Sequence, residues 1–193
     1  MGCDIHLYKE KFDGVNWVAA DKWVPYDYGD DDKGIEVPFR ERFTDRDYDL
    51  FGLLSRGVRR EHSFSWESRG IPFDCCREIK QCADSWGSDG HSHSYLFLHE
   101  LKSMIYFLER ESINISGMIS SHRIAQLKES ISSGNPDWNL LYPYYGWTNQ
   151  AGYEEFSIDV PAIFIVGQSL SKIVDSFNGV DGENHRIVFF FDN

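Results

Sequence analysis

The chain has 193 residues, of which 41% are hydrophobic and 16% aromatic, and it carries a formal net charge of −12 at pH 7. This length fits one domain or two small ones, with a core rich in large flat side chains. The negative charge argues against general binding to DNA, RNA or an anionic membrane, because such binding relies on clustered Lys and Arg. No apolar stretch reaches the roughly 20 residues that a membrane span needs, so none is predicted.

The start of the chain and the cysteines indicate a cytoplasmic protein. No apolar signal segment opens the sequence, and position 6 is His where a myristoylation motif needs Ser or Thr. Reduced thiols are therefore expected. Their spacing matches no Cys-x-x-Cys zinc motif. The cysteines are Cys3, Cys75, Cys76 and Cys82.

The first predicted element is a β-hairpin. Residues 3–10 and 15–24 alternate in polarity and flank Asp13-Gly14, a pair that favours a type I′ turn. Odd positions of the first strand form an apolar face, which we expect to pack on the core. Even positions form a polar face, which meets either water or a pocket.

The next part of the chain predicts a loop and two helices. Residues 25–44 are rich in Asp, Gly, Tyr and Pro, and are predicted to form a long loop. A short helix follows and ends near Gly57. A second helix is predicted to open near 71–74, with Asp74 as its N-cap, and to end before Trp86.

Three further helices and a strand are predicted in the rest of the chain. Apolar residues recur at helical spacing in 97–111, in 117–133 and from Asp159 to Gly179. An aromatic loop, 137–153, separates the last two helices. Residues 187–191 are apolar on both faces, which is typical of a central strand covered on both sides, and we expect it beside the N-terminal strand.

These elements predict a single α+β domain over 1–193. A small, mostly antiparallel sheet, made of the N-terminal hairpin and the C-terminal strand, would pack with several helices. The chain contains no internal repeat, no low-complexity segment and no Gly-rich dinucleotide or phosphate loop.

Two short polar segments are the strongest functional signal. Because alternate side chains of an extended backbone share a face, the Asp and His of the first segment should point together, and so should the two His of the second. The second segment precedes a predicted helix start, where free backbone N–H groups favour an anion. The simpler interpretation is a solvated hairpin face and a surface turn. The segments contain Asp4 and His6, and Asp89, His91, Ser92 and His93.

Two other groups are weaker candidates. Arg56 and Arg59 lie in the most basic stretch of the chain and form either a phosphate cradle or solvent-exposed ion pairs. Tyr145 and Trp147 lie in the aromatic loop, where packing is the simpler interpretation and base stacking the alternative.

Four segments of the chain are distinctive: Met-Gly-Cys-Asp-Ile-His6, Asp45-Arg-Asp-Tyr-Asp-Leu-Phe51, Trp86-Gly-x-Asp-x-His-Ser-His-Ser94 and Ile187-Val-Phe-Phe-Phe-Asp-Asn193. In these segments the chain resembles a family of proteins encoded by bacteriophages and by bacteria carrying prophages. The resemblance runs from end to end and brings context rather than a mechanism: small phage accessory proteins often counter host defences, some by binding or destroying nucleotide second messengers. One departure is Phe97, where the family tends to have Thr, which with Glu100 would form a capping box.

The first functional hypothesis is a binding protein that sequesters a small phosphorylated, nucleotide-like ligand, such as a host-defence second messenger, in the host cytosol. The second segment and an arginine would contact phosphate, and the first segment would contact ribose or base. The expected ligand-binding residues are Asp4, His6, Arg56, Arg59, Asp89, His91, Ser92, His93, Tyr145 and Trp147.

Two alternatives remain open at this point. A phosphodiester hydrolase would use a divalent metal on Asp4, His6, His91 and His93, or His6 and His91 as a metal-free base and acid. A protein–protein inhibitor without a small ligand would use the aromatic segment 142–147 as its contact surface. The sequence names no cofactor other than this candidate metal, and it leaves the oligomeric state open, a homo-oligomer included.

Overall fold

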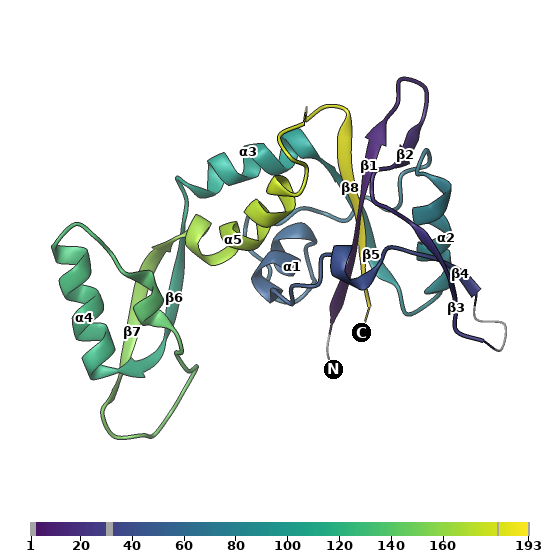
Figure 1. Ribbon diagram of the computed structural model, residues 1–193. Coiled ribbons are helices and arrows are strands. Elements are labelled where there is room, and N and C mark those ends of the chain that lie inside the picture. Colours follow the sequence, from purple (N-terminus) through teal and green to yellow (C-terminus); the bar gives the residue numbers. More distant parts are fainter. Residues whose placement is uncertain (1–2, 30–32, 181, 193) are drawn as a thin grey trace. The chain divides into compact units, whose positions relative to one another are not determined.

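Figure 1 shows the computed structural model, which describes residues 3–29, 33–180 and 182–192. Residue contacts divide the chain into unit 1, Met1–Tyr106 with Gln168–Asn193, and unit 2, Phe107–Gly167. The described residues form five α-helices and three antiparallel sheets, which confirms the predicted α+β class. None of the helices in these ranges has the length and apolar character needed to cross a bilayer.

Unit 1 is built on a four-stranded antiparallel sheet of order β2-β1-β8-β5. The predicted hairpin and the predicted central strand beside it are both confirmed. The strands are β1 (Asp4–Phe12), β2 (Trp17–Ala19), β5 (His91–Phe97) and β8 (His185–Asp192). At the turn, the Asp13 N–H donates to the Asn16 carbonyl over 3.0 Å, and Gly14 takes a φ of 103° that a side chain would disfavour.

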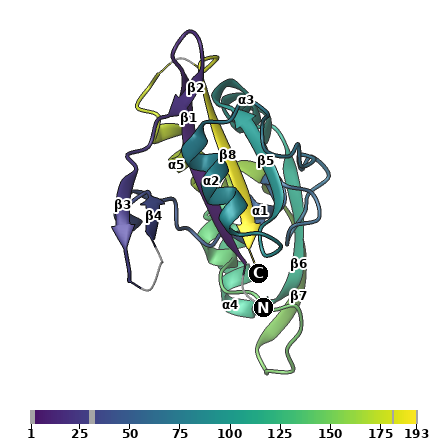
Figure 2. The same cartoon turned by 90° about the vertical axis from the view of Figure 1, so that its right-hand side faces the viewer.

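Helices cover both faces of this sheet. Figures 1 and 2 show α1 (Tyr48–Leu54) on one face and α2 (Arg77–Ser85) on the other. On the α1 face, the rings of Phe51 and Phe191 lie 5.2 Å apart. On the α2 face, Phe190 packs in one cluster with Ile79 and Ala83. Consecutive residues of β8 therefore serve opposite cores, which explains why this strand is apolar on both faces.

Two predictions in the first half of the chain are wrong. The expected loop 25–44 contains a second small hairpin, β3 (Val24–Asp27) with β4 (Lys33–Glu36), and a 3-10 turn, η1 (Phe39–Glu41). Helix α2 begins at Arg77, and Asp74 does not cap it. The Asp74 carboxylate instead accepts a hydrogen bond from Arg186 over 2.9 Å.

Unit 2 corrects the predicted helix 117–133. Its first part is the end of β6 (Ser112–Ser120), which pairs along its whole length with β7 (Tyr153–Pro161), and only then does α4 (Ser121–Ser132) begin. The segment forms a strand because its apolar residues recur at alternate positions, which is the period of a β-strand and not of a helix. These residues are Ile113, Ile115 and Ile119. The aromatic loop is largely confirmed, with one 3-10 turn, η2 (Trp138–Leu141).

The two remaining helices, α3 (Leu98–Leu108) and α5 (Ala162–Asp175), are shorter than predicted. Phe97 provides no side-chain cap, but the Glu100 carboxylate accepts the Phe97 backbone N–H over 2.8 Å. One half of a capping box therefore fixes the start of α3 even without Thr at position 97.

A buried ion pair joins the two central strands on the α2 face. Arg186 of β8 and Glu10 of β1 are 3% and 0% exposed, and their closest nitrogen and oxygen lie 2.6 Å apart. Glu10 also accepts the backbone N–H of Cys76, the residue just before α2. The guanidinium of Arg186 lies 3.9 Å from the centre of the Trp17 ring, which shields the pair from water.

We predict that Glu10→Gln lowers the free energy of unfolding by about 3 kcal/mol, because it leaves a buried guanidinium with one carboxylate fewer. Urea denaturation measures the change. Lys33→Ala is the control, since its ion pair with Asp27 is exposed and is expected to contribute less than about 1 kcal/mol. Equal losses in the two variants would contradict this prediction.

Candidate functional site

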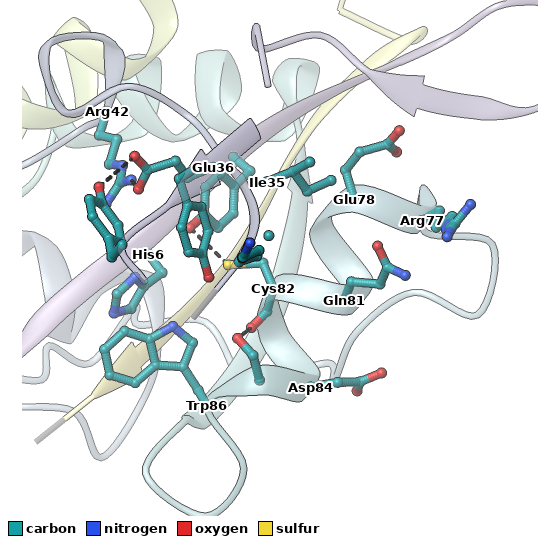
Figure 3. A pocket seen from close by; sticks show the side chains of 16 residues that line it. His6, Ile35, Glu36, Arg42, Arg77, Glu78, Gln81, Cys82, Asp84 and Trp86 are labelled. Atoms are coloured by element: carbon teal, nitrogen blue, oxygen red, sulfur yellow. Dashed lines mark hydrogen bonds and ion pairs between the residues drawn. The ribbon is translucent and has the colours of Figure 1, made fainter. Parts of the chain in front are cut away.

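Unit 1 contains an open cavity of about 1030 Å³ between β1, the β3–β4 hairpin and α2. Figure 3 shows side chains from all three elements around it. Aromatic rings make up much of its lining, while charged groups of both signs lie among them. The aromatic lining residues are His6, Tyr8, Tyr26, Tyr28 and Trp86.

His6 is the one predicted site residue that lines this cavity. It lies opposite Phe190 in the sheet, and the two rings stack with centroids 4.7 Å apart. The Trp86 ring packs on it at 4.3 Å, and Nε2 lies 3.2 Å from a carboxylate oxygen of Asp192. The side chain is 17% exposed, so the imidazole is held on several sides and still reaches the cavity.

The environment of His6 keeps its ring neutral. Burial lowers the pKa of His6 below its ordinary value, and the hydrogen bond and charge of Asp192 oppose this only in part. Because a carboxylate only accepts, the Nε2 position carries the proton. Nδ1 is then a hydrogen-bond acceptor, available to a donor group of a ligand.

The β3–β4 hairpin and the segment after η1 form one wall of the cavity. The rings of Tyr26 and Tyr28 stack 5.0 Å apart, and the Tyr28 hydroxyl donates to Glu36 over 3.0 Å. Glu36 also binds Arg42. A Cβ at Gly34 would lie 2.9 Å from the Tyr26 ring, so glycine lets that ring lie against β4.

Helix α2 forms the facing wall. Arg77, Gln81 and Ser85 recur at spacings of four, which places them along one side of the helix. The Cys82 Sγ lies 3.1 Å from the Tyr8 hydroxyl, and burial raises the pKa of this thiol. Cys82 is therefore a thiol at neutral pH and a poor nucleophile. Arg77 forms no ion pair with any residue that the structure describes, so its charge is available to an anion.

Asp4 does not line the cavity with His6. Arg46 donates two hydrogen bonds of 2.6 Å to its carboxylate, which lowers the pKa of Asp4. The Asp4 backbone N–H donates to Asp192 over 3.0 Å, so the same carboxylate steadies both Asp4 and His6.

The prediction that His91 and His93 point the same way is wrong. His91 lies opposite Phe191 and its ring is 6.1 Å from that ring, whereas the His93 ring stacks on Phe190 at 5.1 Å. These two phenylalanines face opposite sides of the sheet. The cause is an irregularity between His91 and Ser94, where Ser92 has a φ of 52° and breaks the alternation.

The two polar segments therefore meet on one sheet without forming a joint site. His6 and His91 face opposite sides, so they do not form an acid and base pair. His93 shares a face with His6, but Phe190 stands between them, since β8 separates β1 from β5.

The four predicted metal ligands are likewise not assembled. Within residues 3–29, 33–180 and 182–192, the three potential ligands that converge are Glu10, Cys75 and Cys76. Glu10 is already bound by Arg186. Asp89 lies exposed in the turn after α2, outside the cavity.

The other candidates also lie outside the cavity. Arg56 pairs with Glu67 at 2.7 Å, and the Arg59 guanidinium lies 5.2 Å from the Tyr48 ring. Tyr145 and Trp147 belong to unit 2. The sequence analysis did not identify five residues that line the cavity. The tyrosines within 25–44 were the one signal in the sequence that could have pointed to this wall. The five residues are Tyr26, Tyr28, Arg42, Arg77 and Trp86.

Comparison of the chain with protein-family models, with curated proteins and with solved structures finds no match.

The left-handed backbone at Ser92 generates a stability prediction. Ser92→Gly and Ser92→Val both remove the hydroxyl that contacts His91, but only glycine accepts a φ of 52° without strain. We expect the valine variant to be less stable than the glycine variant by about 1 kcal/mol or more in urea denaturation. The same two substitutions at Ser157, in the extended strand β7, should show the opposite order of stability, with valine more stable than glycine. Matching orders at both positions would disprove the bulge.

Proposed function

We propose that the protein binds a small, phosphorylated, nucleotide-like ligand in the cavity beside His6 and retains it without turnover. One observation carries the proposal: a cavity of about 1030 Å³ combines flat aromatic rings, a neutral imidazole acceptor and Arg77, which forms no ion pair within the described part of the chain. Ligand sites typically measure roughly 300–1,000 Å³, with mostly apolar walls and a few placed polar groups.

The aromatic lining suits a nucleobase. Trp86 and the tyrosines of the β3–β4 hairpin offer ring faces on which a planar base can stack, and each such contact is worth roughly 1–3 kcal/mol. Nδ1 of His6 can accept an N–H of the base edge. The Gln81 amide, on the facing wall, can both donate and accept.

The charges of the lining favour a ligand with a small negative charge. Its cations are Lys33, Arg42 and Arg77, and its carboxylates are Glu36, Glu78 and Asp84. Arg42 is neutralised by Glu36, and Lys33 by Asp27. Arg77 is left for phosphate, while the lining carboxylates Glu78 and Asp84 repel further negative charge, which favours a monophosphate or a cyclic phosphodiester over a triphosphate.

Sequestration is favoured over hydrolysis by the chemistry of the lining. Cys82 is protonated, and His6 has no acid partner from His91, which faces the other side of the sheet. The resemblance of the chain to phage and prophage proteins suggests that the retained ligand is a nucleotide messenger of host defence.

The direct test is incubation with a panel of linear mononucleotides and cyclic nucleotides, followed by re-purification, heat denaturation and mass spectrometry of the released molecules. Recovery of an intact nucleotide is the expected result. A converted product would establish turnover instead, and a panel without any retained compound would refute nucleotide binding.

Arg77→Ala should weaken nucleotide binding about tenfold, because a charge-assisted hydrogen bond to phosphate contributes roughly 1.4 kcal/mol or more. Isothermal titration calorimetry measures the dissociation constant. Lys80→Ala is the matched control: it removes the same charge from the same helix at an exposed position outside the cavity. An equal loss in both variants would show a general effect of charge.

Binding should also depend on pH through His6. The ring is faced by Asp192 and Asp4, which favour protonation, and by Arg42 and the surrounding apolar rings, which oppose it. Because burial lowers the pKa of His6, affinity should stay constant above pH about 6.5 and fall as the pH drops through the lowered value. Protonation would turn the Nδ1 acceptor into a donor.

Titration calorimetry with a cyclic nucleotide, whose phosphodiester does not titrate in this range, separates the protein from the ligand. His6→Asn keeps a short acceptor and removes the titrating ring, so its affinity should be lower and independent of pH between 5 and 8. A wild-type affinity that stays constant while the His6 ring itself titrates would show that His6 does not contact the base.

A further inference from the structure

In unit 2, one face of the β6–β7 sheet is open. The opposite face packs on α4 through a core that includes Ile115, Leu127 and Phe156. The open face is polar and largely exposed along both strands. It presents Asn114, Ser116 and Met118 of β6, and Glu155, Ser157 and Asp159 of β7.

One edge of this sheet is only partly paired. β7 pairs with one edge of β6. At the opposite edge of β6, Met118 exchanges two backbone hydrogen bonds with Tyr145, of 2.7 and 2.9 Å. In an antiparallel ladder, alternate residues direct their N–H and C=O groups to the same edge. The backbone N–H and C=O groups of Asn114 and Ser116 therefore point to the same edge of β6 as those of Met118. No described residue pairs with them at this edge.

The segment around Tyr145, which pairs with Met118, carries exposed aromatic side chains. Trp147 is 76% and Tyr145 45% exposed. The Tyr145 ring contacts that of Tyr153 at 5.8 Å. A Cβ at Gly117 would lie 2.6 Å from the Tyr145 carbonyl oxygen, so only glycine there lets this segment approach β6.

The open face carries negative charge one strand away from the Met118–Tyr145 pair. Glu155 lies opposite Met118 on this face, and Asp159 lies opposite Asn114. The whole chain carries a net charge of −12, which disfavours a second copy of itself at this edge. Aromatic faces next to carboxylates are instead complementary to Lys and Arg side chains.

We propose that the open edge of β6 binds an extended, basic segment of a partner protein by strand addition. The segment would pair with the backbone of Asn114 and Ser116, in line with Tyr145, and its cationic side chains would contact Trp147, Tyr145 and Glu155. Main-chain hydrogen bonds would supply affinity and the aromatic and acidic side chains specificity. This activity is independent of the nucleotide cavity in unit 1.

The test uses the full chain and a synthetic peptide of alternating Lys and Thr residues, with binding measured by biolayer interferometry. We expect saturable binding that weakens with added salt, and no binding of the same peptide with Glu in place of Lys. Trp147→Ala should weaken the binding about tenfold, and Ser116→Pro, which removes the outward N–H, should abolish it. Arg77→Ala in unit 1 should leave it unchanged.

Circular dichroism establishes whether each variant folds. If Ser116→Pro does not fold, the test rests on Trp147→Ala, which changes an exposed side chain. Equal binding of the Lys and Glu peptides would overturn the proposal, and so would wild-type affinity in a folded Trp147→Ala variant. A dimer of the full chain in sedimentation equilibrium, lost in Ser116→Pro, would identify a second copy as the occupant and would overturn it as well.

Discussion

The buried ion pair between Arg186 and Glu10 is the interaction on which the architecture of unit 1 depends. It ties β8 to β1 at the centre of the sheet, and the same carboxylate accepts the backbone N–H that precedes α2. Arg186 reaches on to Asp74 in the segment leading into that helix. Because α2 is one wall of the cavity and β1 carries His6, the pair fixes two sides of the candidate site. Desolvation offsets much of the attraction within a buried pair of this kind, but removal of one partner leaves the other charge buried and is strongly destabilising.

The alternation of side chains along β8 imposes a second constraint. Phe190 packs under His6, Trp86 and His93 on the α2 face, and Phe191 packs against α1 on the other. The Phe190 and Trp86 rings bury His6 between them, and this burial lowers its pKa in spite of the Asp192 carboxylate. The Phe190 ring also stands between His6 and His93. Thus Phe190 helps to keep His6 a neutral acceptor at the cavity, and it also separates His6 from His93.

Sequence periodicity predicted the parts of the fold that obey it. The Asp13-Gly14 turn, the apolar run of β8 and the short helix α1 follow from local chemistry, and the structure has all three. His91 and His93 were misplaced because their alternation holds only in a regular strand, and the left-handed backbone at Ser92 has no clear sequence signature. The cavity could not be predicted either. Tyr26 lies far in sequence from Arg77 and Trp86, which belong to α2 and its C-cap, and only the packing of the β3–β4 hairpin and α2 around β1 brings them to one place.

The state of His6 is also the reason that we propose retention at this cavity and not catalysis. A general base needs a pKa near the working pH and a free nitrogen aimed at the reacting proton, and a hydrolase further needs an acid for the leaving group. In His6, the lowered pKa weakens the base, and Nε2 is engaged by Asp192. The remaining nitrogen can accept a fixed hydrogen bond without taking the proton. Such a fixed acceptor selects a ligand that presents a hydrogen-bond donor at this position. This selection requires no chemical change in the ligand.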